Sequence, residues 1–493
     1  MFILLGISVI FVIFFMTISA EYFGASIPHI FIFIIYVVVY IQIPGDILID
    51  SLHLQYDNLF SQKLIAFFSG CAVLIIEYYC FSIICSTWVI ILLNPSILII
   101  YIGIKMHNQG IENTFNVKGN LTIKISMLLF IVLILTLFLF NMQFQYMSPE
   151  KVAFTSLGQD FVWHMGNINA LATSFPPSDP RLGGVPFYYH HFQDLIYSIC
   201  LKIFGIPADV LHYTCSPYLL TYIFGGSLLA FFKEFCHKGN RAEWYALFFV
   251  ILNFCPMGVA ILDENFTKSW LNIHIFSNVN CVAFSMAAIL IFIVSLKYYK
   301  RYQSILISML IMFMATGLKG PMALVLILGI IITLLSEVIF TRCFDQYQLL
   351  ISLGSIFTFC IVYLFVISGF QSGRAPKGTE LSISMIETIQ RGSVYNWIIN
   401  YLPDNQIWLY YVGVGVVVLL EMIGLVSTIA IPYLFYMVLT GKNIFTSKCK
   451  IPWERKVVYF SILIGIGGFL FVNQDGFSQI YFLFAVIPLM YLE

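Results

Sequence analysis

Long apolar runs recur along almost the whole of this chain, and they limit the folds open to it. A helix needs about 20 apolar residues to cross the hydrocarbon core of a bilayer, which is ~30 Å thick. Hydrophobic residues make up 60% of the sequence and charged residues only 10%, which is outside the usual range of soluble globular proteins. The sequence therefore predicts an all-α, polytopic membrane protein with lipid as its surroundings.

The positions of the apolar runs predict roughly 14 transmembrane helices. Five runs precede a polar stretch, near residues 1–22, 30–48, 64–82, 88–104 and 125–141. The others follow it, near residues 213–232, 242–262, 275–296, 304–318, 322–340, 349–370, 408–439, 457–472 and 477–492. We divide the chain into additional N-terminal helices, 1–124, and a transmembrane core, 125–493, with an outer loop at 143–192.

The distribution of Lys and Arg predicts which loops face the cytoplasm, because short cytoplasmic loops are enriched in these residues. Basic segments at 105–124, 233–241, 297–301, 341–343 and 441–456 fall on one side of the membrane if the runs are as given. The segments around Asp160 and at 263–274, 317–321, 371–404 and 473–476 then fall on the other side. We expect a multi-pass protein of a bacterial plasma membrane, with a shared site on its outer face.

The longest polar stretch, residues 158–192, gathers several ionisable side chains. Asp160 and His164 are spaced i, i+4 and would share one face of a helix. The prolines and glycines of 175–186 favour a structured loop. The following "FYYHHF" places Tyr189, His190 and His191 at the depth of the membrane interface. Adjacent helical positions point about 100° apart, so at most one of the two histidines is expected to face a site.

Three patches carry a resemblance to a known superfamily: "QDFVWHMGNINALATSFPPSDPRLGGVPFYYHHFQDL", "GLKGPMAL" and "FSQIYFLFAVIP". They resemble bacterial membrane glycosyltransferases of the GT-C superfamily, and "LKGP" looks like the "TKGP" element of its aminoarabinose and mannosyl transferases. The resemblance covers roughly residues 125–493. It implies a GT-C-like fold and transfer of a sugar from a polyprenyl-phosphate donor to an extracytoplasmic lipid, glycan or protein. It also implies an essential acid in the first outer loop, which here is Asp160.

The chemistry of such a transfer assigns roles to the polar residues. Asp160 is the candidate general base, which takes the proton of the acceptor. Lys319 is the candidate partner of the donor phosphate, because an ammonium is a compact charge with several donors. The further candidates for substrate binding are Arg181, His164, Tyr189, His190, His191, Asp263 and Glu264.

A divalent metal is not predicted as a requirement. Many enzymes of the superfamily have two adjacent acids in the first loop, whereas this chain has Gln159 followed by Asp160. Asp263 and Glu264 could complete an acidic site from the next outer loop. A zinc or manganese site made of Asp160, His164 and a later histidine remains an alternative.

Other functions and plainer roles stay open at this point. A transporter or flippase for lipid-linked sugars would need the donor but no bond chemistry, and a membrane scaffold would need neither. Asp160 could cap a helix, His164 could be a packed aromatic residue, and Lys319 could extend to the lipid headgroups. Nucleic acid is not an expected partner, because the net charge is zero and no basic face is evident. The eleven cysteines contain no CxxC pair and predict neither a disulfide framework nor a zinc ribbon.

Overall fold

The computed structural model describes residues 26–84, 88–109, 159–173, 178–179, 185–235, 246, 281–299, 301–341, 345–369, 382–383, 451–473 and 479–492. The predicted helices at 1–22, 125–141, 242–262 and 408–439 lie almost entirely outside these residues. Arg181, Asp263 and Glu264 also lie outside them. For Asp160 only the backbone is described.

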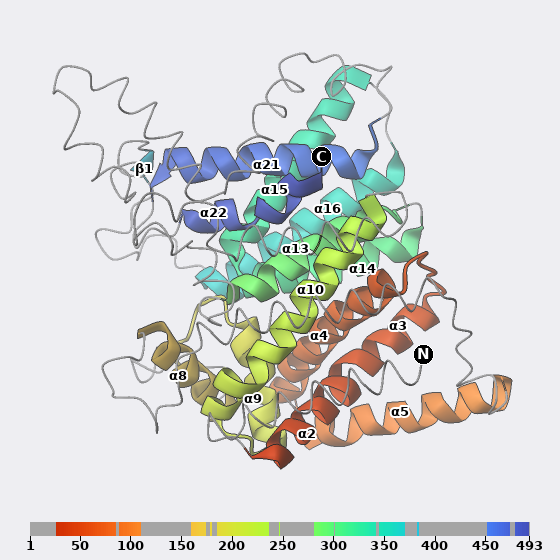
Figure 1. Ribbon diagram of the computed structural model, residues 1–493, viewed down its shortest axis with the longest axis vertical. Helices are drawn as coiled ribbons and strands as arrows, with labels where there is room; N and C mark the ends of the chain where they lie inside the picture. The colour runs from red at the N-terminus through yellow and green to blue at the C-terminus, as the bar shows by residue number, and fades with distance from the viewer. Residues whose placement is uncertain are drawn as a thin grey trace.

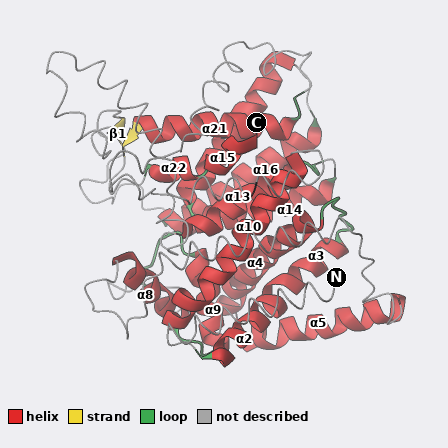
Figure 2. Cartoon of the chain, viewed as in Figure 1, coloured by secondary structure: helices red, strands yellow, loops and turns green. Residues whose placement is uncertain are grey.

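The described part of the chain is mostly helical (Figure 1 and Figure 2). Its α-helices are α2 (Ile27–Tyr36), α3 (Ile43–Ser51), α4 (Leu59–Ile84), α5 (Trp88–Gln109), α8 (Gln159–Thr173), α9 (Phe192–Phe204), α10 (Ser216–Phe235), α13 (Val282–Leu296), α14 (Tyr302–Leu318), α15 (Gly320–Ser336), α16 (Gln346–Val362), α21 (Trp453–Phe471) and α22 (Ile480–Phe484). The π-helical segments η1 (Val37–Gln42), η3 (Val210–Cys215), η7 (Glu337–Thr341) and η8 (Tyr363–Ser368) extend several of these helices, and η11 (Ile487–Leu492) is a 3-10 helix. Two short antiparallel strands, β1 (Ser382–Ile383) and β2 (Val472–Asn473), pair with each other.

Four helical segments of the described residues are long and apolar enough to cross a membrane. They are Ile27–Ser51, Leu59–Ser82, Gly320–Ile339 and Gln346–Ser368. Shorter apolar helices occupy Val89–Ile104, Val282–Leu296 and Tyr302–Leu318. These helices coincide with predicted apolar runs, and they support a membrane protein. The total of roughly 14 crossings and the GT-C-like arrangement stay predictions.

Helix α13 forms the centre of the described bundle (Figure 1). Every residue of this helix is buried, and most of them are apolar on all sides of the helix. A helix that is apolar all round is stable in contact with other helices or lipid and not at a water boundary. Helices α4, α10 and α14 pack directly against it. The core of the described part therefore lies along α13.

Helices α3 and α4 approach each other closely because glycine occupies both sides of their contact. A Cβ atom on Gly45 would lie 1.8 Å from the carbonyl oxygen of Ala66, and one on Gly70 would lie 1.9 Å from that of Ile41. Such contacts between small residues are a common way to pack helices in lipid, where hydrophobicity does not drive the association. Any larger residue would force the two backbones apart.

Several of the predicted loops make contacts in the described part of the chain. Lys297 Nζ lies 2.7 Å from Glu234 Oε2, and Lys456 Nζ lies 2.6 Å from Glu337 Oε1. Strand β1, from the loop at 371–404, pairs with β2, and Lys319 contacts His190. The assignment of the loops to two sides of a membrane stays a prediction.

The predicted crossing at 477–492 is not one continuous helix. Its described residues form the five-residue helix α22, a turn, and the 3-10 helix η11. Pro488 accounts for this break, because proline lacks an N–H donor and its ring collides with the carbonyl four residues earlier in an α-helix. The segment packs against α15, α21 and α13 instead.

Candidate functional site

Helix α8 brings the first polar residues of the sequence to the bundle. It begins at Gln159, so Asp160 lies in its first turn. His164 follows one turn later and is completely buried. Helix α8 packs along α9 (Figure 1), and His164 faces that contact. The predicted helical spacing of Asp160 and His164 is confirmed for the backbone.

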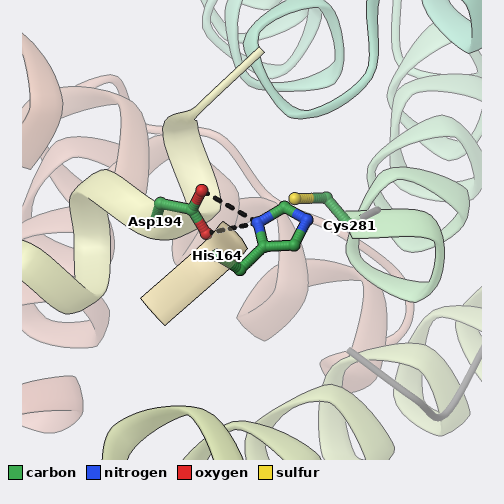
Figure 3. Close-up of side chains that lie close together, drawn as sticks. All are labelled: His164, Asp194 and Cys281. Atoms are coloured by element: carbon green, nitrogen blue, oxygen red, sulfur yellow. Dashed lines mark hydrogen bonds and ion pairs between the residues drawn. The ribbon is translucent and has the colours of Figure 1, made fainter. Parts of the chain in front are cut away.

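The partner of His164 is Asp194 on α9 (Figure 3). The Nδ1 atom of His164 lies 3.0 Å and 2.9 Å from the two carboxylate oxygens, and both side chains have no exposed surface. The amide of Asn167 donates to the same carboxylate at 3.0 Å. Two donors from α8 therefore converge on one buried acid of α9. The orientation of His164 is set by a carboxylate, as in many catalytic and metal-binding histidines.

A second contact fixes the same helix pair. The hydroxyl of Ser198, one turn after Asp194, lies 2.8 Å from the carbonyl oxygen of Ile168 and 2.6 Å from that of Asp194. Asp194 and Ser198 are spaced i, i+4, so they present one polar face of α9 to α8. The start of α9 is held from the other side by Phe192, which packs on Gly317 and Phe313 of α14.

Lys319 lies between α14 and α15, as the sequence predicted, and it is almost fully buried with 2% of its surface exposed. Its backbone is extended, and α15 begins at Gly320 with Pro321 in its first turn. The Nζ atom lies 2.8 Å from Nε2 of His190 and 3.8 Å from the centroid of the Tyr481 ring. A lysine that reaches lipid headgroups would expose its ammonium, so this plainer role does not fit the structure.

The adjacent histidines point to different partners. His190 contacts Lys319, and the ring of Tyr189 stacks on it with 3.8 Å between centroids. His191 instead hydrogen-bonds the hydroxyl of Tyr79 at 3.0 Å and the carbonyl oxygen of Tyr189 at 2.6 Å. Only His190 joins the Lys319 cluster, which confirms that one of the pair faces elsewhere. Both precede α9, so the cause is the non-helical backbone before the helix rather than helical spacing.

Burial controls the charge of these two imidazoles. The pKa of His190 lies well below its ordinary value of 6.5, first because of burial and then because of the neighbouring Lys319, His164 and His191. Burial lowers the pKa of His191 to about 4, against the opposing effects of its bond to Tyr189 and the charge of Asp194. His190 is therefore neutral near pH 7, and its Nε2 atom accepts a hydrogen bond from the ammonium of Lys319.

Cys281 completes the polar group around His164. It stands directly before α13 with a positive φ of 58°, a conformation that is uncommon for residues other than glycine. His164, Asp194 and Cys281 each offer a ligand atom, and these atoms all lie within 4.8 Å of one another. In Figure 3 the sulfur of Cys281 lies beside the His164 ring, and Asp194 lies on the ring's Nδ1 side. The ring of His212 stacks over His164 at 6.1 Å.

Several residues of this site were missed by the sequence interpretation. Asp194, Asn167, Gln193 and Cys281 were not candidates, although Asn167 follows His164 at i+3 and Asp194 follows the histidine pair. Gln193 is completely buried, and among the described residues neither of its amide atoms has a hydrogen-bond partner. The proposed metal set of Asp160 with His164 and a later histidine stays a prediction, because the Asp160 side chain is outside the described part.

Comparisons with known proteins found no family model, no curated protein and no solved structure that matches the chain.

Proposed function

We propose that this protein is a membrane glycosyltransferase of the GT-C type, which transfers a sugar from a polyprenyl-phosphate donor to an extracytoplasmic acceptor. Asp160 is the general base, and Lys319 holds the phosphate of the donor. His190 and Tyr481 position the ammonium. The proposal rests on the resemblance of three sequence patches to this superfamily and on the setting of Lys319.

The observation that carries the proposal is the burial of Lys319 beside the α8–α9 histidines. Its ammonium contacts His190, which is neutral near pH 7, and the face of Tyr481. Electrostatic attraction between an ammonium and a phosphate is much stronger in such low-dielectric surroundings than in water. A lipid-linked donor would approach from the bilayer, and α15, which begins directly after Lys319, belongs to a segment long and apolar enough to cross one. This setting suits a phosphate attached to a lipid.

The reaction requires one proton acceptor and one stabilised leaving group. The hydroxyl or amine of the acceptor attacks the anomeric carbon of the donor sugar and gives its proton to the carboxylate of Asp160. The bond between the anomeric carbon and the phosphate oxygen breaks, and its electron pair leaves with the polyprenyl phosphate. Lys319 stabilises the charge that develops on this leaving group. Asp160 lies one helical turn before His164, on the helix that packs against α9 beside His190.

Gln193 adds a group that suits the sugar. A buried amide without a hydrogen-bond partner is costly, by about 1–3 kcal/mol. Its oxygen and nitrogen match the hydroxyls of a carbohydrate, which are both donors and acceptors. We assign the sugar to the region where α9 begins, between Gln193 and Lys319.

Measurement of donor binding to the Lys319→Met variant tests the proposed contact between Lys319 and the donor phosphate. Purified protein in lipid nanodiscs would be incubated with labelled polyprenyl-phosphate sugars, and bound donor would be measured at equilibrium. Removal of a charge-assisted hydrogen bond worth about 1.5–3 kcal/mol weakens binding about 10- to 100-fold. Lys202→Met is the matched control, because Lys202 also lies over a tyrosine ring, 5.5 Å from the Tyr78 centroid, but is away from His190.

The same preparation separates the enzyme from the alternative function, a flippase for lipid-linked sugars. An enzyme releases polyprenyl phosphate when an acceptor is present, whereas a flippase moves the donor between leaflets and leaves it intact. Equal donor affinity in Lys319→Met and Lys202→Met would reject the role of Lys319. Movement of intact donor without any release of polyprenyl phosphate would reject the transferase.

A further inference from the structure

We propose that His164, Asp194 and Cys281 bind a zinc ion that joins α8, α9 and α13. The three residues come from parts of the chain that are far apart in sequence, and their ligand atoms all lie within 4.8 Å of one another. All three side chains are buried. This site is separate from the phosphate contact of Lys319 and does not depend on the proposed transfer reaction.

The spacing of the ligand atoms suits one ion. Zinc binds sulfur, nitrogen and oxygen at about 2.0–2.3 Å, so two ligand atoms on a tetrahedral zinc lie about 3.3–3.7 Å apart. The Nδ1 atom of His164 and Oδ2 of Asp194 are 2.9 Å apart in the structure. Cys281 lies at the edge of the same group (Figure 3). Coordination requires rotation of the side chains, because their ligand atoms now lie within 4.8 Å of one another and not yet at the spacing of a tetrahedral ion.

The ligand types select zinc over the hard divalent cations. A thiolate and an imidazole are preferred by zinc, while magnesium, calcium and manganese prefer carboxylates, carbonyls and water. The group contains one sulfur, one nitrogen donor and one carboxylate. A glycosyltransferase that bound its metal only through acidic residues would offer the metal oxygen ligands alone. The two kinds of site can therefore be told apart by metal identity.

The ligands offset the charge of the ion. Zinc binds cysteine as the thiolate, so binding releases the proton of the Cys281 thiol. The Cys281 thiolate and the Asp194 carboxylate then oppose the two positive charges of zinc, and His164 coordinates as a neutral imidazole. This pairing of charges reduces the electrostatic cost of an ion at this depth.

Neighbouring residues orient the ligands, as is usual at zinc sites. Asn167 donates to Oδ2 of Asp194 at 3.0 Å and fixes the rotation of the carboxylate. Cys281 occupies the left-handed region at φ 58°, which costs about 1–2 kcal/mol for a residue with a Cβ. Strained conformations of this kind persist where surrounding interactions hold them in place. A bond between zinc and the Cys281 thiolate supplies such an interaction.

The consequence is a metal that joins α8 to the centre of the described bundle. Zinc connects α8, which carries Asp160 in its first turn, to α13 at the centre of the bundle. The described residues supply three ligands, and a tetrahedral ion has a fourth position for water or another side chain. Because α8 contacts the described bundle mainly through α9, a bond to α13 would restrict its motion relative to Lys319.

Metal analysis of the full-length protein tests the proposal without any sugar donor. Protein purified in detergent would be incubated with zinc, passed through a desalting column and analysed by mass spectrometry for bound metal. We expect about one tightly held zinc per chain. Cys281→Ser should lower the zinc content at least ~10-fold, since removal of one of three protein ligands weakens the site strongly. Cys200→Ser is the matched control, because Cys200 is a buried cysteine of α9 outside the group.

Replacement of zinc by cobalt gives a second measurement that needs no folded variant. Cobalt bound to a thiolate has an intense charge-transfer absorption in the near ultraviolet, and the unsubstituted protein and Cys200→Ser should both show it. A folded unsubstituted protein that holds no zinc and gives no thiolate–cobalt absorption would overturn the proposal and leave a His164–Asp194 hydrogen bond. Zinc content that is equal in the unsubstituted protein and Cys281→Ser would also overturn it, because the metal would then lie elsewhere.

Discussion

Replacement of Asp194 by asparagine should destabilise the contact of α8 with the bundle. Asp194 is completely buried and accepts from His164 at 2.9 Å and 3.0 Å and from Asn167 at 3.0 Å. Asparagine keeps the shape but removes the charge, and one of its two polar atoms becomes a donor. That donor must face either His164 or Asn167, which are donors themselves. A hydrogen bond to a charged group contributes about 1.5–3 kcal/mol, and a buried donor left without an acceptor loses that stabilisation.

We expect Asp194→Asn to lower the free energy of unfolding by about 2 kcal/mol, within that range, because the amide oxygen can still accept one hydrogen bond. The measurement is unfolding by SDS titration in mixed micelles, combined with limited proteolysis between residues 159 and 173. Cleavage there should become faster. If zinc occupies the site, loss of a ligand changes the stability in the same direction.

Asp46→Asn is the matched control for this prediction. Asp46 pairs with Lys63 at 2.9 Å, but their side chains are 21% and 46% exposed. Exposed ion pairs contribute at most about 1 kcal/mol because water and salt screen them. If Asp194→Asn and Asp46→Asn had equal effects on unfolding and left proteolysis unchanged, the buried carboxylate would not be what holds α8.

Two further predictions concern histidine charge and helix packing. The pKa of His191 falls from 6.5 to about 4 on folding, so the unfolded chain binds more protons between these values and the free energy of unfolding decreases as the pH falls from 6.5 to 4. In SDS titrations this loss of stability should be about 3 kcal/mol smaller in His191→Gln than in the unsubstituted protein. An unchanged pH profile in the variant would exclude His191 as the cause. Gly70→Ala should lower the free energy of unfolding by about 1–3 kcal/mol, because the added Cβ overpacks against Ile41. Gly103→Ala is the control and should be neutral or stabilising, because a Cβ there meets nothing within 4 Å. Equal effects of the two changes would contradict the close packing of α3 and α4.

The apolar helices could be predicted from the sequence. Apolar runs of sufficient length specify helices in lipid, and α14, α15 and α16 coincide closely with the predicted runs at 304–318, 322–340 and 349–370. "GLKGP" marks a helix boundary because Pro321 can only start a helix there. Lys319 was a candidate for the same reason. These signals are local, so they can be found without the fold.

The pairing around His164 could not be predicted from local signals. Asp194 follows a loop at the start of α9, where an acid is common for its interaction with the helix dipole, and nothing nearby indicates burial. Cys281 comes much later and resembles the other cysteines in apolar surroundings. Their meeting depends on how α8 and α9 pack against the start of α13. Such contacts between distant segments have no periodic signature in the sequence.

The rate of sugar transfer by Asp160→Asn tests the central claim most directly. Asp160 lies in the first turn of α8, and asparagine removes its ability to accept a proton while keeping its size. If Asp160 is the general base of a glycosyltransferase, release of polyprenyl phosphate should fall by at least ~100-fold, while membrane insertion and donor binding stay unchanged. Transfer at a near-normal rate by a correctly inserted Asp160→Asn protein would contradict the assignment.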